Sequence, residues 1–417
     1  MRPPLLLLCL FAALTGCESG NRDASETAST ATGHGAEGTL QGGGAPGGLS
    51  EAQERELERI GTLGYTVGGD RAPDALGVTV VGPEASEGYT VYVSGDFPGA
   101  HLIDIEGRVL HTWREDVAES WSRAWVYPDG SVLGVSAHPG RLIKLDRDSR
   151  LLWTYGGEKL RAHHDVTVDA DGTIYVLMRV GTVLEWLRPK PLLVDLICIL
   201  EPDGESVREV ACVPVAESFR DSRFAHMLES PVLGEGEDPF HTNCVEVLDG
   251  RVPHPAFRDG NILVTIRNMD CLAVIDPDEG TVVWANVGRW QRQHEARVTP
   301  DGRVMLFDNR KFDGKSRVIE YDVVADEIVW SYAAENFFSQ GTGAQQLLPN
   351  DNVLVTESQK GRVFEVTREG RVVWEFWNPS LMEDGETIVR VTRAFRVPYD
   401  YFEREFGRTL RQEGGRD

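Results

Sequence analysis

Strand–turn–strand segments recur through most of the chain, and this repeat restricts the possible fold more than any other feature of the sequence. Clear copies begin at Arg123, His164, His294 and Gly343, where alternating apolar and polar residues surround an Asp-Gly or Asn-Asp turn, the pattern of a β-hairpin. A second hairpin in each unit ends in a tryptophan; these runs are LLWTY at Trp153, VVWAN at Trp284, IVWSY at Trp330 and VVWEF at Trp374. Four strands in each repeat of roughly 40 to 50 residues predict the blades of a β-propeller.

The starts of the units predict six blades. They lie at Arg123, His164, His241, His294, Thr342 and Arg393. The interval between the second and third starts is long, because residues 185–191 and 217–233 interrupt the strand pattern and indicate a loop-and-helix insertion. The last start lacks the rest of a blade, whereas the strands at residues 90–113 lack an opening strand. We therefore expect an all-β, six-bladed propeller over residues 85–400, closed by the C-terminal strand so that no sheet edge stays open.

The first residues have the pattern of a secretory signal peptide. Arg2 precedes a short apolar run, and LTGC ends at Cys17, which predicts export and cleavage after residue 16. The apolar run is too short to span a bilayer. The LTGC string resembles the lipobox of bacterial lipoproteins, which implies that Cys17 anchors the chain to the cell envelope, at the periplasmic face of a membrane or at the cell surface. The alternative is an ordinary signal peptide with an incidental cysteine.

The segments on either side of the propeller have simpler patterns. Residues 17–49 are rich in Gly, Ser, Thr and Ala and predict a flexible tether. Ser50 and Gln53 form a capping box that predicts a short helix, within a lead-in over residues 50–84. Residues 401–417 are expected to form a C-terminal tail.

Charge and cysteine content narrow the partners and the compartment. The chain carries 42 Lys and Arg against 66 Asp and Glu, a formal net charge of −24. Such a field disfavours nucleic acid and anionic membrane surfaces as partners. Cys198 and Cys212 flank a turn at residues 201–204 and would face each other across a hairpin. An exported compartment permits a disulfide there, and the sequence leaves open whether it forms.

Basic side chains recur at the starts of the units. Since the first strand of each blade lies nearest the axis of a propeller, these side chains are expected to gather at one mouth of the channel. They are Arg123, His163, His164, His241 with Asn243, His294 and Arg393, whereas the start at Thr342 has no charge. Guanidinium groups fit phosphate or sulfate oxygens, so an anion site is expected here without a metal. A zinc site held by three histidines is the alternative.

Several strings resemble one enzyme family, the bacterial arylsulfotransferases and their close relatives. They are DPFHTNCVEVL at Asp238, RQHEARVTPDGRVMLFDNR at Arg292, SRVIEYDV at Ser316 and KGRVFEVTREGRVVWEF at Lys360. The resemblance covers roughly residues 85–400. It implies an exported six-bladed propeller that moves a sulfo group from an aryl sulfate donor to a phenolic acceptor, without a nucleotide sulfate donor and with no cofactor. A homodimer is left open.

The resemblance also implies roles for individual residues. His241 and His294 match histidines that face the substrate, and Arg310, or secondly Arg317, would neutralise the sulfonate oxygens. The family's nucleophile is a histidine in the C-terminal quarter, but this chain has no histidine after His294. His294 or His164, which has the same repeat phase, would then be the nucleophile. Alternatively, the acceptor attacks directly with a histidine as general base, or the protein only binds its ligand.

Three other functions fit parts of the sequence. A propeller can serve as a rigid, non-catalytic display surface for a protein or a glycan. Residues 275–284 read IDPDEGTVVW, which resembles the tryptophan repeat of quinoprotein propellers, although six blades and four clear tryptophan repeats argue against that family. The zinc alternative corresponds to an exported hydrolase.

Overall fold

A computed structural model describes residues 50–61, 68–203, 206–234 and 236–413. The predicted signal peptide, the lipid anchor at Cys17 and the tether lie outside the described residues. Helix α1 (Glu51–Gly61) begins at the predicted capping box, where Gln53 Oε1 accepts from the Ser50 amide at 2.9 Å and Ser50 Oγ accepts from the Gln53 amide at 3.3 Å. Within this part of the chain, no helix combines the length and apolar character needed to cross a membrane.

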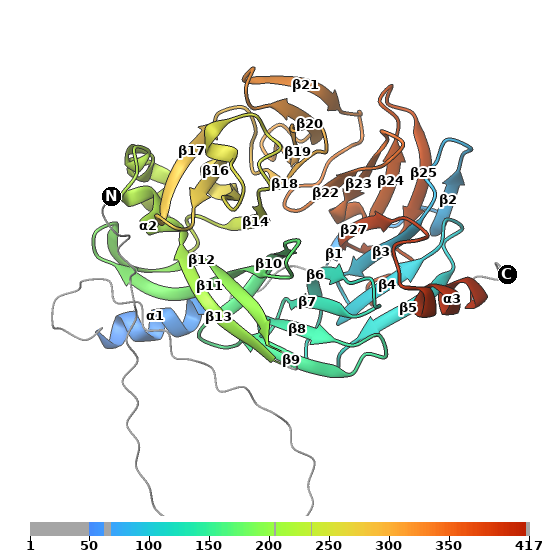
Figure 1. Cartoon of the computed structure of the whole chain (residues 1–417), viewed down its shortest axis with the longest axis horizontal. Helices are drawn as coiled ribbons and strands as arrows, with labels where there is room; N and C mark the ends of the chain where they lie inside the picture. Colours follow the sequence, from blue (N-terminus) through green and yellow to red (C-terminus); the bar gives the residue numbers. More distant parts are fainter. Residues whose placement is uncertain (1–49, 62–67, 204–205, 235, 414–417) are drawn as a thin grey trace, which may run out of the picture. The chain divides into compact units, whose positions relative to one another are not determined.

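The described strands form six large antiparallel sheets around a common axis (Figure 1). From the axis outward, blade 1 contains β27 (Val391–Val397), β3 (Tyr89–Ser94), β4 (Gly99–Ile103) and β5 (Val109–Arg114). Blade 2 contains β6 (Trp121–Val126), β7 (Val132–Ser136), β8 (Arg141–Leu145) and β9 (Leu151–Gly156). Blade 3 contains β10 (Arg161–Val168), β11 (Ile174–Leu184), β12 (Arg188–Asp203) and β13 (Ser206–Pro214).

The remaining blades follow in chain order. Blade 4 contains β14 (Thr242–Val247), β15 (Ile262–Ile266), β16 (Cys271–Asp276) and β17 (Thr281–Val287). Blade 5 contains β18 (His294–Val298), β19 (Val304–Asp308), β20 (Arg317–Asp322) and β21 (Glu327–Tyr332). Blade 6 contains β22 (Ala344–Leu347), β23 (Val353–Glu357), β24 (Arg362–Val366) and β25 (Val372–Trp377), with β2 (Gly77–Val81) added outside β25. The prediction of a six-bladed β-propeller is therefore confirmed.

The C-terminal strand closes the ring, as predicted. Strand β27 pairs antiparallel with β3, from Val391 opposite Ser94 to Val397 opposite Tyr89. Strand β1 (Gly68–Arg71) pairs with β26 (Thr387–Val389) just before this closure. Both ends of the propeller are thus held by strands that lie far apart in the sequence.

Apolar side chains fill the space between neighbouring blades. Between blades 1 and 2, for example, Trp113 and Trp121 are fully buried, and Phe406 and Leu410 of helix α3 (Arg404–Glu413) join the same cluster. The segment expected to be a simple tail therefore contains a helix whose apolar face covers the first blades.

The insertion between blades 3 and 4 differs from the prediction in its first half. Residues 185–191 were expected to interrupt the strands, but β11 and β12 form one long hairpin in which only residues 185–187 turn. The pairing continues because Thr182 lies opposite Leu192 and Leu184 opposite Arg188. The second half is helical, with α2 (Val215–Arg220), η1 (Ala225–Glu229) and η2 (Pro231–Gly234). Three further short turns of helix are η3 (Pro255–Phe257), η4 (Arg267–Met269) and η5 (Ser358–Lys360).

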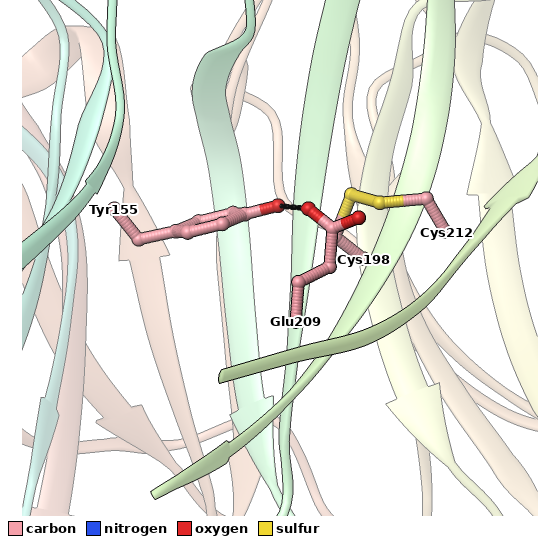
Figure 2. The surroundings of a disulfide bond; sticks show 4 residues. All are labelled: Tyr155, Cys198, Glu209 and Cys212. Carbon is pink, nitrogen blue, oxygen red and sulfur yellow. Dashed lines mark hydrogen bonds between the residues drawn. A yellow bond between two sulfur atoms is a disulfide. The ribbon is translucent and has the colours of Figure 1, made fainter. Parts of the chain in front are cut away.

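Cys198 and Cys212 lie opposite each other in β12 and β13 and form a disulfide (Figure 2). Glu209, also in β13, accepts a hydrogen bond from the Tyr155 hydroxyl of blade 2. The disulfide therefore braces the hairpin at the point where blade 3 contacts its neighbour.

Two truncations separate ring closure from helix packing. Ending the chain after Glu386 removes β27 and leaves β3 without its partner, so we expect no cooperative thermal unfolding transition. Ending it after Val397 removes only the segment that contains α3, so a lower Tm with a retained transition is expected. Circular dichroism melts of both variants check this. A sharp transition in the shorter chain would contradict closure by β27.

Candidate functional site

The strands nearest the axis share an irregularity at one mouth of the propeller. Five of the six inner strands in the described ring have a register shift near their first residues, and the inner strand of blade 6 is regular. A β-bulge bends the strand and redirects a side chain. His164, His241 and Glu295 accordingly have left-handed backbones, with φ of 56°, 52° and 56°, a conformation that is strained for residues with a Cβ and clusters at functional sites.

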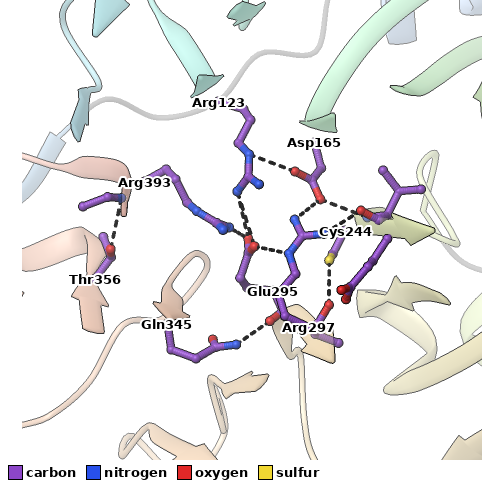
Figure 3. Close-up of polar contacts among 12 residues, drawn as sticks. Arg123, Asp165, Cys244, Glu295, Arg297, Gln345, Thr356 and Arg393 are labelled. Atoms are coloured by element: carbon purple, nitrogen blue, oxygen red, sulfur yellow. Dashed lines mark hydrogen bonds and ion pairs between the residues drawn. The ribbon is translucent and has the colours of Figure 1, made fainter. Parts of the chain in front are cut away.

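Charged side chains from different blades meet at the axis (Figure 3). Glu295 pairs with Arg123 at 3.3 Å, with Arg297 at 2.6 Å and with Arg393. Asp165 pairs with Arg297 at 2.6 Å and with Arg123 at 3.1 Å. Burial alone would raise the pKa of Asp165, but Arg123 and Arg297 lower it to about 2. We call these five residues the axial cluster; its two carboxylates hold three buried or half-buried guanidinium groups in place.

Polar side chains next to three of the bulges also bond to the backbone of a neighbouring blade. Asp165 accepts from the Val245 amide at 2.9 Å, and Asp195 accepts from the Thr242 amide at 2.6 Å. Gln345 donates from Nε2 to the Glu295 carbonyl oxygen. These bonds satisfy backbone groups that the interrupted ladders leave without a partner, so the site residues are fixed across blade boundaries.

His294 is the most completely fixed histidine of the site. Its Nδ1 lies 2.6 Å from Oδ1 of Asn309, whose Nδ2 donates to the Ser339 and Thr342 carbonyl oxygens at 2.8 and 2.9 Å. Since carbonyl oxygens only accept, the amide orientation of Asn309 is determined, and His294 must donate from Nδ1. Burial, and secondly Arg267, lowers the pKa of His294 to about 3. The neutral ring therefore carries its lone pair on Nε2.

A second unit joins His241 to His164. Asp238 accepts from His241 Nδ1 at 2.6 Å, and the Nε2 atoms of the two histidines lie 3.1 Å apart. Burial would raise the pKa of Asp238, but His241 and Arg179 hold it below its ordinary value. The ionised carboxylate can only accept, so neutral His241 presents its Nε2 lone pair to the Nε2 proton of His164. Burial, and secondly the charge of His241, lowers the pKa of His164, so this ring is held neutral with one proton between the two Nε2 atoms.

Unlike the other histidines of the site, His163 pairs with Asp195. Its Nε2 lies 3.4 Å from Asp195, and both side chains are buried. Burial, and secondly the charge of Arg179, lowers the pKa of His163. Burial and the nearby Asp238 carboxylate raise the pKa of Asp195 to about 7. This pair therefore supports the start of blade 4 behind His241.

A cavity of about 60 Å³ opens among these residues. The buried polar atoms of its lining that lack a hydrogen-bond partner within the described chain include Asn243 Oδ1, His294 Nε2 and Thr342 Oγ1. His164, Arg123 and Arg393 also line it. Orphaned polar atoms around a space of about two water molecules are what a small polar group would satisfy.

Two predicted residues lie elsewhere. Arg310 is partly exposed and pairs with Asp313 at 2.7 Å, whereas Arg317 pairs with buried Asp308 at 2.8 Å and donates to the Arg289 carbonyl oxygen. Neither arginine lines the cavity. The strand ends before Arg310, whose left-handed backbone, with φ of 44°, turns the loop outward.

The acidic and amide partners of the site histidines were not among the predicted site residues. Asp238 and Asn309 stand inside the quoted DPFHTN and FDN strings, so their proximity to the histidines was a usable signal. Glu295 directly follows His294, but nothing in its spacing indicates that it would pair with arginines of blades 1 and 2.

The zinc alternative finds no support in the donor atoms. Among the described residues, the groups of three potential ligand atoms within reach of one ion are Cys198 with Glu209 and Cys212, and Asp165 with Cys244 and Glu295. The first contains the disulfide, and the carboxylates of the second already pair with arginines. The four histidines of the site do not form such a group.

Removing the shared carboxylate of the axial cluster should destabilise the fold. Glu295→Gln leaves buried guanidinium groups with one carboxylate fewer, and we expect the free energy of unfolding to fall by about 3–5 kcal/mol. Urea denaturation measures the change. Exposed Glu335 supplies the matched control, and Glu335→Gln should change stability by less than about 0.5 kcal/mol. Equal effects of the two substitutions would contradict a structural role for Glu295.

The protonation of His294 can be observed directly. At pH 5, ¹⁵N NMR of histidine-labelled protein should show His294 neutral, with the proton on Nδ1, because its pKa lies near 3. The unfolded chain binds this proton near pH 6.5, so His294 makes stability fall as the pH decreases from about 6.5 towards 3. In Asn309→Ala the Nδ1 tautomer should lose its preference. A protonated His294 at pH 5 would show that this assignment is wrong.

Comparison with known proteins identifies the family of this chain. A protein of unknown function from Bacteroides caccae is similar, with a TM-score of 0.52 and 13% identity over 74% of this chain and 98% of that chain; at this identity the likeness concerns the fold alone. The Cps50 (Swd1) β-propeller domain of Myceliophteria thermophila has a TM-score of 0.44 and 10% identity over 75% and 89% of the two chains. No curated protein matches significantly. The sequence model for Arylsulfotransferase (ASST) matches residues 128–379, more than half of the chain, and the protein therefore belongs to the arylsulfotransferase family.

Proposed function

We propose that this protein transfers a sulfo group from an aryl sulfate to a phenolic acceptor, with His294 as the nucleophile. Membership of the arylsulfotransferase family indicates an arylsulfotransferase-like function. One observation supports the choice of nucleophile: the buried Nε2 of His294 carries a lone pair, lacks a hydrogen-bond partner in the described chain and lines the cavity. His294 would thus take the role of the family's C-terminal histidine, because the sequence has no histidine after His294.

In the first half-reaction, His294 Nε2 attacks the sulfur of the donor. The N–S bond forms as the bond between sulfur and the phenolic oxygen breaks, and the leaving phenolate takes a proton. The ring becomes positively charged while Nδ1–H keeps its bond to Asn309. Asn309 thus holds the nucleophile in one tautomer before attack and accepts from the more acidic N–H after it.

The His164–His241 pair is placed to handle the proton. When the pair carries an extra proton, it supplies this proton to the leaving phenolate. Asp238 stabilises the positively charged form of the pair before the transfer. In the second half-reaction the neutral pair takes the proton of the acceptor phenol, whose oxygen attacks the sulfur as the N–S bond breaks. Protons balance over the cycle, and no water or oxidant is consumed.

Positive charge around the cavity suits a sulfonate. The axial cluster contains three guanidinium groups and two carboxylates, and Arg393 and Arg123 line the cavity. Fixed cations stabilise the negative charge that moves onto the leaving oxygen, because they are already oriented before the reaction. We assign these arginines to electrostatic support of the leaving oxygen.

The same proposal includes the cellular context. The N-terminal LTGC string supports export and lipid attachment through Cys17 to the cell envelope. A disulfide in blade 3 suits an oxidising compartment. An exported enzyme without a nucleotide donor would use aryl sulfates that reach it from outside the cytoplasm.

Incubation with p-nitrophenyl sulfate, with and without phenol, tests the reaction. Phenol-dependent release of nitrophenolate is expected, and His294→Ala should lower kcat more than about 10³-fold. His241→Ala should lower it about 10²- to 10⁴-fold, as for loss of a general acid–base. His226→Ala, at an exposed histidine of the insertion, is the matched control and should keep full activity. Mass spectrometry after rapid acid-free quenching should find one sulfo group on His294.

Different failures have different meanings. Release without phenol would indicate a sulfatase. Activity that survives the double change of His241→Ala and His294→Ala would place the site elsewhere. Lack of release from any aryl sulfate over a wide pH range would favour a non-catalytic binding propeller.

A further inference from the structure

The loop between β19 and β20 presents an aromatic side chain to solvent. Phe312 is 69% exposed and is the only exposed phenylalanine among the described residues. A single exposed apolar side chain is common on a protein surface, but an aromatic ring offers a flat apolar face on which a ligand can stack. The loop starts at Asn309, which holds His294, so the exposed ring is three residues away from a residue of the site.

The backbone of this loop is held in place. The Arg310 amide donates to the Gln291 carbonyl oxygen at 3.0 Å, and the Asp313 amide donates to the Arg310 carbonyl oxygen at 2.9 Å. At the far end, Ser316 Oγ donates to the Asn309 carbonyl oxygen at 3.0 Å. Phe312 is therefore carried on a loop whose two ends are bonded together, which lowers the entropy lost when a ligand stacks on it.

Basic side chains connect Phe312 with His294. The guanidinium carbon of Arg292 lies 5.8 Å from the centre of the Phe312 ring. Arg292 and Arg267 both donate to Asn268 Oδ1, the latter at 2.8 Å. Arg267 in turn is close enough to His294 to lower its pKa, after the larger effect of burial. We call Phe312, Arg292, Asn268 and Arg267 the aryl strip.

The charge of the strip contrasts with that of the whole chain. The protein has a formal net charge of −24, whereas the loop adds Lys311 and Lys315 beside Arg292 and Arg267, and its Arg310 is paired with Asp313. Local positive charge on an acidic protein attracts anions to this place in particular. A ring next to guanidinium groups suits a molecule that is aromatic at one end and anionic at the other.

We propose that the aryl strip is the recognition surface for the substrate, and that an aryl sulfate stacks its ring on Phe312 while its sulfate contacts Arg292 and Arg267 on the way to His294. The direction of the sulfate towards His294 rests on the proposed function, but stacking on Phe312 does not. The strip would make the protein select aryl over alkyl sulfates.

Isothermal titration of the whole protein with two sulfonates tests the strip without any turnover. Toluenesulfonate and methanesulfonate both carry a carbon–sulfur bond, so neither can donate a sulfo group. Toluenesulfonate should bind at least about tenfold more tightly, since stacking on an aromatic side chain has about this effect. Phe312→Ala should remove that preference and leave methanesulfonate binding unchanged, whereas Arg292→Gln should weaken both ligands.

The controls keep the outcomes separate. Val324→Ala removes another exposed apolar side chain, in the turn between β20 and β21, and should change neither affinity. Phe312→Leu keeps an apolar side chain without a ring and should retain less than half of the preference. Equal affinities for the two sulfonates, no binding of either, or an unchanged preference in Phe312→Ala would overturn the proposal. Selective binding of toluenesulfonate by a protein that transfers no sulfo group would refute the proposed function and leave the strip supported.

Discussion

The antiparallel pairing of β27 with β3 is the interaction on which the rest of the structure depends. It joins the last strand of the ring to a strand that lies about 300 residues earlier in the sequence, and it gives blade 1 its inner strand. Without it, blade 1 would expose an open edge and Arg393 would lack a fixed position at the axis. Ring closure is a contact of very large sequence separation, so most of the chain must be ordered before its entropy cost is offset.

The axial cluster follows from that closure. Arg393 arrives on β27, Arg123 on β6, and Glu295 follows His294 on β18, so the cluster unites blades that are distant along the chain. Arg123 and Arg393 have both a structural role and a position at the cavity. They balance buried carboxylates, which removes an unpaired charge from the interior, and they face a cavity that contains orphaned polar atoms. A basic residue at the axis is therefore neither purely structural nor simply a ligand-binding group.

The sequence predicted the architecture well because a propeller is periodic. The Asp-Gly or Asn-Asp turns and the tryptophans of the fourth strands repeat at a spacing that is typical of few folds. The incomplete first and last units indicate that the ring is closed by the C-terminal strand.

The site was predicted less completely than the fold. Repeat phase placed His164, His241 and His294 near one mouth, but it cannot show that Asn309 turns inward while Arg310, the next residue, turns outward. That difference arises from a left-handed backbone after a strand end. The sequence pattern also does not predict the long β11–β12 hairpin, because Pro189 and Pro191 lie in the segment expected to interrupt the strands, although an outer extension of a strand tolerates proline.

The small volume of the cavity also has a kinetic consequence. A cavity of about 60 Å³ has room for a sulfo group beside His294 but not for two aromatic rings, and Arg123, Glu295 and Arg393 of the axial cluster line it. In the proposed reaction, donor and acceptor would therefore occupy this space in turn, and the first phenol would have to depart before the second could approach. The protein would hold the sulfo group during this exchange, so the lifetime of the sulfated histidine against water limits how dilute the acceptor can be.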